Sequence, residues 1–267
     1  MIILAIDTSA IASAALIRSH ETTDGDPGAP NDAAVLASFA TEDTKSHAEV
    51  LAPGIRALLA EQELAPGEIE RIVVGIGPGP FTGLRSGIAT ARALAFAWDV
   101  PLHGVMSLDA LAWDVLAAGV PDDGAGAPGA DGAAPPSSAP PSSVPPEFGA
   151  PEFGARDFAI ATDARRKELY WARYGADGVL RDGPHVTPPG GLPAVPVYGA
   201  GAGIYPEQLA DAGATCVHAF DAAQPTAASL GLVAAARIAR GLPLADTTPL
   251  YLRESDAQVP GPRKRAL

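Results

Sequence analysis

Short apolar runs alternate with polar turns along the first part of the chain and predict an α/β fold. The runs Ile2–Ile6, Ile11–Ile17 and Ala34–Ala40 are expected to form three strands, the first two as a hairpin. Apolar positions then recur at helical spacing from Ser46 onward, and Glu49 three residues later completes a capping box with that serine. The chain therefore opens with three strands and an amphipathic helix.

The segment Gly75–Ala95 predicts the end of a buried strand, a glycine- and proline-rich turn and a helix of small residues. The β-branched residues 72–74 supply the strand, and Gly77, Gly79 and Gly83 permit positive φ and close backbone approach. Such a turn directs free backbone N–H groups towards the helix N-terminus, which suits a phosphate. The alternative is a tight strand-to-helix connection in which the glycines serve only packing.

The rest of the chain predicts a second set of elements that opens on a hairpin, like the first. The predicted elements are a strand at Leu102–Val105, a hairpin of Phe158–Thr162 and Leu169–Tyr174, a strand at Val195–Tyr198, the glycine cluster Gly199–Gly203 and a helix over Thr226–Arg240. We expect two related α/β lobes around a cleft. The first lobe is expected to cover residues 1–118 and the second lobe residues 157–245, with a tail over 246–267. Between the lobes, residues 119–156 are rich in proline, glycine, alanine and serine and predict a flexible insertion. The last helix of the second lobe is expected to pack back on the first lobe.

Composition narrows the classes of protein that the chain can be. With 18 lysines and arginines against 31 acidic residues, the net charge is −13, which repels phosphate backbones and disfavours tight nucleic-acid binding by the chain alone. The single cysteine, Cys216, fits a reducing compartment. Asp7 interrupts the N-terminal apolar run, and no basic residue precedes it, so no signal peptide is expected. These features predict a cytoplasmic protein.

Three polar or glycine-rich elements are candidates for a nucleotide-like cleft. An acid followed by two hydroxyls, Asp7-Thr8-Ser9, can hold a metal–phosphate unit, although an Asx-type turn explains it equally well. The second glycine cluster can accept an adenine or ribose ring, or form an ordinary turn. The candidate cleft residues are Asp7, Thr8, Ser9, Gly77, Gly79, Thr82, Gly83, Gly199 and Gly201.

Other polar residues predict no catalytic or metal site. The five histidines are isolated in the sequence, with no pair at helical spacing, and no GxSxG motif is present. The charged run Asp163–Glu168 lies between two predicted strands and is typical of a solvated turn. We therefore expect neither metal catalysis nor a catalytic triad.

Four segments together resemble the TsaB (YeaZ) family: ILAIDTS, GIGPGPFTGLRSGIATARALA, TDARRKELYWARY and PLYLRESDA. The resemblance implies the two-lobed fold of actin, Hsp70 and the sugar kinases, with duplicated βββαβαβα units. It also implies that the chain is the non-catalytic partner of the enzyme TsaD. TsaD transfers a threonylcarbamoyl group to an adenosine of tRNA. TsaD proteins carry two metal-binding histidines four residues apart. Ser107 and Leu111 stand at those positions here.

This departure favours a scaffold and activator subunit over an enzyme, with no metal and no catalytic residue. The alternative is an ATP-dependent, kinase-like phosphotransferase of the same fold that uses Asp7 and the two glycine turns. No cofactor is expected for this chain itself, with ATP acting within the complex.

The resemblance also implies the partners of the chain. The helices at Ser46–Gln62 and Gly83–Trp98 would pair with a TsaD-like transferase, and a TsaE-like ATPase would join the complex. The chain alone would form a homodimer through the same surface, and tRNA would be contacted only through partners. The expected interface residues are His47, Val50, Leu51, Ile55, Leu58, Leu84, Gly87, Ile88, Ala91 and Leu94.

Overall fold

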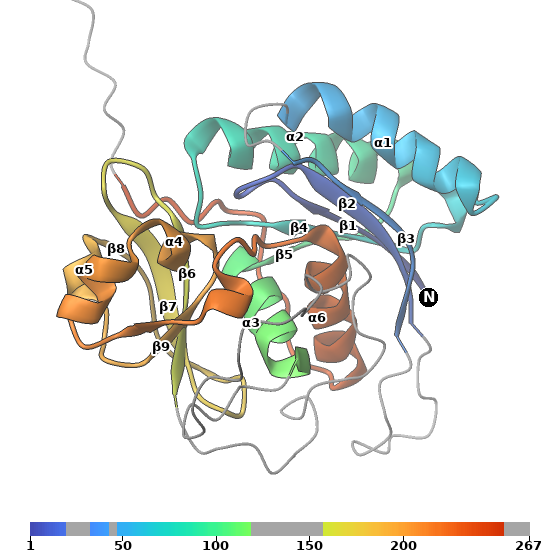
Figure 1. Ribbon diagram of the computed structural model, residues 1–267. Coiled ribbons are helices and arrows are strands. Elements are labelled where there is room, and N and C mark those ends of the chain that lie inside the picture. Colours follow the sequence, from blue (N-terminus) through green and yellow to red (C-terminus); the bar gives the residue numbers. More distant parts are fainter. Residues whose placement is uncertain (20–32, 43–46, 119–156, 254–267) are drawn as a thin grey trace, which may run out of the picture.

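The computed structural model describes residues 1–19, 33–42, 47–118 and 157–253 (Figure 1). The predicted helix cap at Ser46 and the predicted insertion over residues 119–156 lie outside these residues. The described chain forms two five-stranded mixed sheets, in the orders β3-β2-β1-β4-β5 and β10-β9-β6-β7-β8. Among the described helices, none is both long enough and apolar enough to cross a membrane.

The first sheet combines an antiparallel meander with two parallel strands. Its strands are β1 (Ile2–Asp7), β2 (Ser13–Arg18), β3 (Ala34–Ala40), β4 (Arg71–Gly75) and β5 (Leu102–Val105). The central strand β1 pairs antiparallel with β2 and parallel with β4, so that Ala5 lies opposite Ala15 on one side and Val73 on the other. This arrangement buries β1 on both faces and along both edges.

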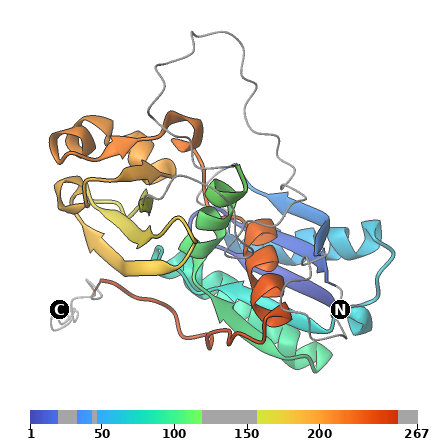
Figure 2. The ribbon, with the colours of Figure 1, turned by 90° about the horizontal axis from the view of Figure 1, so that it is seen from below.

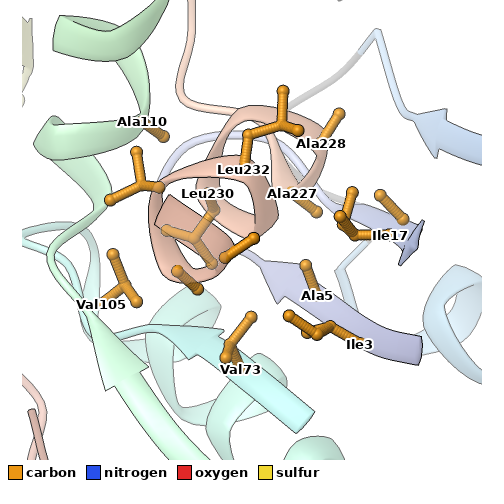
Figure 3. Close-up of a cluster of buried hydrophobic side chains, with 14 of the residues drawn as sticks. Ile3, Ala5, Ile17, Val73, Val105, Ala110, Ala227, Ala228, Leu230 and Leu232 are labelled. Atoms are coloured by element: carbon orange, nitrogen blue, oxygen red, sulfur yellow. The ribbon is translucent and has the colours of Figure 1, made fainter. Parts of the chain in front are cut away.

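Helices cover both faces of the first sheet. On one face lie α1 (His47–Glu61) and α2 (Phe81–Trp98), with the short 3₁₀ turn η1 (Pro66–Glu68) between them in the chain. On the other face lie α3 (Ser107–Ala118) and α6 (Ala227–Ala239). Figure 3 shows Leu230 of α6 directed at the sheet, towards Val73 and Val105. Gly231 lets this helix approach closely, because a Cβ there would lie 2.4 Å from Cγ1 of Ile17.

The second sheet repeats the strand order of the first. Its elements are β6 (Phe158–Asp163), β7 (Leu169–Tyr174), β8 (Leu180–Thr187), η2 (Pro189–Gly191), β9 (Pro196–Tyr198), α4 (Ala200–Ile204), α5 (Pro206–Asp211), β10 (Thr215–Cys216) and η3 (His218–Phe220). Here β6 takes the central place of β1, between an antiparallel β7 and a parallel β9. The shared order of strands supports a duplicated βββαβαβα unit in which η2 stands in place of the first helix.

Helix α3 lies between the two halves of the molecule. Ala110 and Trp113 belong to the core beneath the first sheet. Leu111, Val115 and their neighbours pack instead against Phe158 and other aromatic residues of the second sheet. This helix therefore belongs to both cores.

After α6, residues 245–253 form an extended C-terminal strap along the first half towards the second. Ala245 pairs with Gly104 at the edge strand β5, and the amide of Leu250 donates to the carbonyl of Ile76 at 2.8 Å. Figure 2 shows the strap as the red segment that leaves α6 and reaches the second half. The strap covers part of a sheet edge that would otherwise be exposed.

The predicted α/β class with two related halves is confirmed, as are the strands and the final helix. Other parts of the prediction were incomplete or wrong. The helices α3 and α5 and the strands β8 and β10 were not predicted. Gly199 caps the short helix α4, which contains the rest of the glycine cluster where a turn was expected.

Candidate functional site

Asp7 lies at the end of β1, and its carboxylate is held by two serines. Its Oδ1 accepts hydrogen bonds from the amide of Ser9 at 2.8 Å and from the Ser9 hydroxyl at 2.7 Å. Its Oδ2 accepts a hydrogen bond from Oγ of Ser107, on α3, at 2.6 Å. All three side chains are buried. The acid therefore forms the predicted Asx-type turn and also ties β1 to α3.

The first glycine turn is packed against this same group. The amide of Gly77 (φ +92°) donates to Oγ of Ser107 at 3.1 Å, and the amide of Ser107 donates back to the Gly77 carbonyl at 2.9 Å. A Cβ on Gly75 would lie 1.8 Å from Oδ2 of Asp7, and one on Gly79 would lie 2.4 Å from the Ser9 carbonyl oxygen. The chain's own atoms thus occupy the space that these glycines leave.

Thr8 holds the start of α2 through a side-chain hydrogen bond. Its hydroxyl donates to the carbonyl of Gly83 at 2.7 Å, and a Cβ on Gly87 would lie 2.2 Å from that hydroxyl oxygen. Thr82, one residue before Gly83, is exposed. These contacts favour the packing interpretation of the glycine turn over a phosphate cradle.

The second glycine cluster packs against β6. Gly199 has φ +105°, and a Cβ there would lie 2.4 Å from the Ala161 carbonyl oxygen and 2.8 Å from Cδ2 of Leu111. A Cβ on Gly201 would lie 2.8 Å from the carbonyl carbons of Ala161 and Thr162. Close backbone approach within the protein explains why glycine is needed at both positions.

One turn of α3 links the two glycine clusters. Ser107 contacts the first cluster, and Leu111, one helical turn later, contacts the second. The structure therefore brings Asp7, Ser9 and Gly77 together directly, and connects them to Gly199 only through this helix. Ser107 was not predicted as a cleft residue, although its hydroxyl donates to Asp7.

A second buried polar cluster joins α3 to strand β7 and helix α6. Asp109 accepts hydrogen bonds from Tyr174 and Arg237, each at 2.8 Å. Burial raises the pKa of Asp109, and the Arg237 guanidinium opposes that rise. Nearby, Asp114 accepts from the Ser229 hydroxyl at 2.5 Å, and burial raises its pKa to about 7. None of these residues was singled out from the sequence, because their partners lie far apart along the chain.

A cavity of about 310 Å³ opens beside this cluster. Trp113 and Leu116 of α3, Tyr174 of β7 and Leu180 of β8 line it, and the Asp109–Arg237 pair lies on its wall. The residues that line it include none of the candidate cleft residues. The cavity is therefore separate from the candidate cleft.

The histidines whose side chains the structure describes do not form a metal site. His103 on β5 lies beside Arg71, and burial together with that guanidinium lowers its pKa. His185 and His218 pair with acids of their own segments. Within the described residues, no group of three or more histidines, cysteines and acids is placed to hold a metal ion.

The structure corrects the residues expected at a partner interface. Seven of them face the chain's own sheet and are buried: Leu51, Ile55, Leu58, Leu84, Gly87, Ile88 and Ala91. Val50 and Leu94 are partly buried against the same core, and the side chain of His47 lies outside the described part. The apolar stripe of each helix contacts its own sheet, so only the opposite face is available to a partner.

The exposed residues of α1 and α2 are mostly small or charged, with one large aromatic side chain. Phe96 is 91% exposed, the highest value among the large hydrophobic residues described as exposed. The cations Arg56, Arg85 and Arg92 are exposed on the same two helices. The exposed small residues are Ala52, Ala57 and Ala60 of α1 and Ala89, Ala93 and Ala97 of α2. We call these residues, with Phe96, the outer helix face. Small side chains allow a second pair of helices to approach closely.

The fold defines a class of protein with two related α/β halves. Similarity to known proteins identifies the family within this class. A family model described as "TsaD: tRNA N6-adenosine threonylcarbamoyltransferase" matches residues 34–123. The chain is 35% identical over 261 residues to the uncharacterized protein Rv3421c of Mycobacterium tuberculosis, covering 96% of this chain and 93% of that protein.

Two further relatives carry family names. The chain is 35% identical over 112 residues to the tRNA threonylcarbamoyladenosine biosynthesis protein TsaB of Bacillus subtilis, which is 42% of this chain and 44% of that protein. The structure of YeaZ from Pseudomonas aeruginosa superposes with a TM-score of 0.61 at 26% sequence identity. The match covers 94% of this chain and 100% of the YeaZ chain. The chain belongs to the TsaB/YeaZ-like family, and its fold is that of YeaZ.

Proposed function

We propose that this protein is a non-catalytic subunit of the complex that makes N6-threonylcarbamoyladenosine on tRNA, where it binds and activates a TsaD-like transferase. Relatives named for this biosynthesis and the match to a TsaD family model support the proposal. The YeaZ structure matches 94% of this chain, which supports assigning the proposed function to the whole chain and not to one half of it.

The observation that carries the proposal is the environment of Ser107 and Leu111. These residues stand where the family resemblance places the metal-binding histidines of the transferases. Here the first makes hydrogen bonds to Asp7 and Gly77, and the second packs against Gly199. Neither side chain is a metal ligand of the imidazole type, and both are buried.

We further propose that the outer helix face receives the transferase. Phe96 would enter a pocket on a partner helix pair while the alanines around it permit close packing. Isolated chains would form a homodimer through the same face, which would compete with the transferase. A TsaE-like ATPase would join the assembled pair, and ATP would act within that complex.

Reconstitution tests the proposal. Unmodified tRNA is incubated with the transferase, the ATPase, ATP and the threonylcarbamoyl donor, with and without this chain, and the modified nucleoside is measured by mass spectrometry. Modification should require the chain, and the chain alone should modify nothing. Full activity without the chain, or transfer by the chain alone, would contradict the proposal. ATP hydrolysis by the isolated chain that Asp7→Asn abolishes would support the kinase-like alternative.

A further inference from the structure

Basic side chains gather along the C-terminal strap of a chain whose net charge is −13. Three elements contribute them: the exposed side of α2, the strap itself and the turn between β6 and β7. The six residues, of 18 lysines and arginines in the chain, are Arg85, Arg92, Arg165, Arg166, Lys167 and Arg253. We call this surface the strap track.

Direct contacts make the strap track continuous from α2 to the second half. Arg92 donates to the Thr247 carbonyl at 3.0 Å, and Arg85 donates to the Tyr251 hydroxyl at 2.9 Å. Arg253 then forms an ion pair with Glu168 and donates to the Arg165 carbonyl at 3.3 Å. The seven residues from Thr247 to Arg253 span at most about 20 Å between their first and last Cα atoms, which is long enough for several nucleotides.

The β6–β7 turn displays three successive cations. Arg165, Arg166 and Lys167 have φ values of +61°, +56° and +63°, and all three are exposed. This left-handed backbone is uncommon for residues other than glycine. The amide of Glu168 donates to the Arg165 carbonyl at 3.0 Å and closes the turn. The turn thus keeps its cations at the surface instead of folding them onto the sheet.

Aromatic rings lie among these cations. The rings of Phe81 and Tyr251 are 4.5 Å apart between centroids, and the Arg85 guanidinium carbon lies 5.3 Å and 5.6 Å from the two rings. Tyr251 is 40% exposed. An accessible aromatic ring beside guanidinium groups is the arrangement on which unpaired nucleic-acid bases stack.

We propose that the strap track binds an RNA strand, with its cations on the phosphates and Tyr251 against a base. Three acids lie beside it: Asp163 pairs with Arg165, Glu168 pairs with Arg253, and Asp246 interacts with Arg92, so the six cations outnumber these acids on an otherwise acidic chain. That contrast would orient the RNA onto this surface. The inference rests on the proposed function, since the RNA would be the tRNA that the complex modifies, and it replaces the expectation of purely indirect tRNA contact.

Binding of a fluorescent tRNA transcript tests the strap track, with the chain alone and with its co-purified transferase. The test variant is Arg166→Gln/Lys167→Gln. The control variant is Arg18→Gln/Arg181→Gln, which removes two exposed charges, one at the end of β2 and one near the start of β8, that do not belong to the strap track. Anisotropy is measured over a series of salt concentrations, and complex formation is measured separately by size-exclusion chromatography.

The test variant should bind tRNA about tenfold more weakly at 0.1 M salt, with a salt dependence reduced by about one to two ion equivalents. Tyr251→Ala should weaken binding as well, and the control should match the unaltered chain. Equal affinity of both double variants, or no tRNA binding by either form, would overturn the strap track. If the test variant no longer bound the transferase, the strap track would be a protein interface, and the RNA-binding proposal would be overturned as well. Failure of the unaltered chain to bind the transferase would contradict the proposed function alone.

Discussion

The Oγ of Ser107 and the Oδ2 of Asp7 lie 2.6 Å apart, although 100 residues separate them in the sequence. The same Oγ accepts the amide of Gly77, so this hydroxyl joins β1, the first glycine turn and α3. The carboxylate oxygens of Asp7 serve the protein's own structure.

Ser107→Ala should destabilise the fold by about 1–3 kcal/mol, because it leaves the buried Asp7 carboxylate and the Gly77 amide without this partner. The exposed Thr82 provides a control, since Thr82→Ala should change stability by less than about 0.5 kcal/mol. Chemical denaturation measures both. A Ser107→Ala protein as stable as the unaltered chain would show that the hydrogen bonds are energetically neutral.

Asp114 should make the fold less stable as the pH rises. Its pKa is raised from 3.8 to about 7, so between these values the folded state holds a proton that the unfolded state has lost. This contribution is fully present below pH 3.8 and is lost as the pH rises through about 7. Because water still reaches part of this residue, the loss should be at most a few kcal/mol, at about 1.4 kcal/mol per pKa unit.

Asp114→Asn should flatten that dependence, since the amide oxygen still accepts from Ser229 without titrating. Urea denaturation from pH 4.5 to pH 8 measures it (a range of about 3.5 units that covers the transition). The exposed Asp211→Asn is the matched control and should keep the slope of the unaltered chain. Identical slopes for both variants would rule out Asp114 as the titrating group.

The Asp109–Arg237 pair should show strong energetic coupling. Arg237→Met leaves the buried Asp109 carboxylate with only Tyr174 and should cost about 3 kcal/mol. Adding Asp109→Asn removes the unpaired charge and should restore more than half of the lost stability. A double-mutant cycle by denaturation measures the coupling. Additive effects of the two substitutions would mean that the ion pair contributes little.

Phe96→Asp should weaken association through the outer helix face without destabilising the monomer, because the ring is 91% exposed. Loss of a central aromatic anchor costs about 2 kcal/mol or more, which is about thirtyfold in Kd. Isothermal titration with the transferase measures it. Ile204→Asp, at an exposed apolar residue on α4, is the control and should leave Kd unchanged. Equal effects of the two substitutions would place the partner elsewhere.

The sequence predicted those elements whose pattern is local. Strand and helix periodicity depends only on residues that are close together in the sequence. For this reason the β-branched runs of β1 and β4 and the capped final helix were predicted. Helix α3 was missed because nine of its twelve residues are buried, which removes the amphipathic period. Strand β8 was missed because its polar residues and Gly183-Pro184 suit an edge strand and show no alternation.

The site was predictable only in part. The Asx-type turn at Asp7 follows from neighbouring residues, whereas its contact with Ser107 depends on tertiary structure. Periodicity predicted the apolar stripes of α1 and α2, and the family resemblance placed them at a partner interface, whereas Leu51 and Ile88 contact the chain's own sheet. A sequence pattern shows that a face is covered and does not show by what.

The position of α6 has a consequence for the order in which this protein is made. Its side chains complete the core beneath the first sheet, yet they come from residues 227–239, after the whole second sheet. During synthesis the core on that face, to which α3 already contributes Ala110 and Trp113, stays incomplete until α6 has been made. The two halves therefore cannot mature one after the other, as separate domains do, and must reach their native state together.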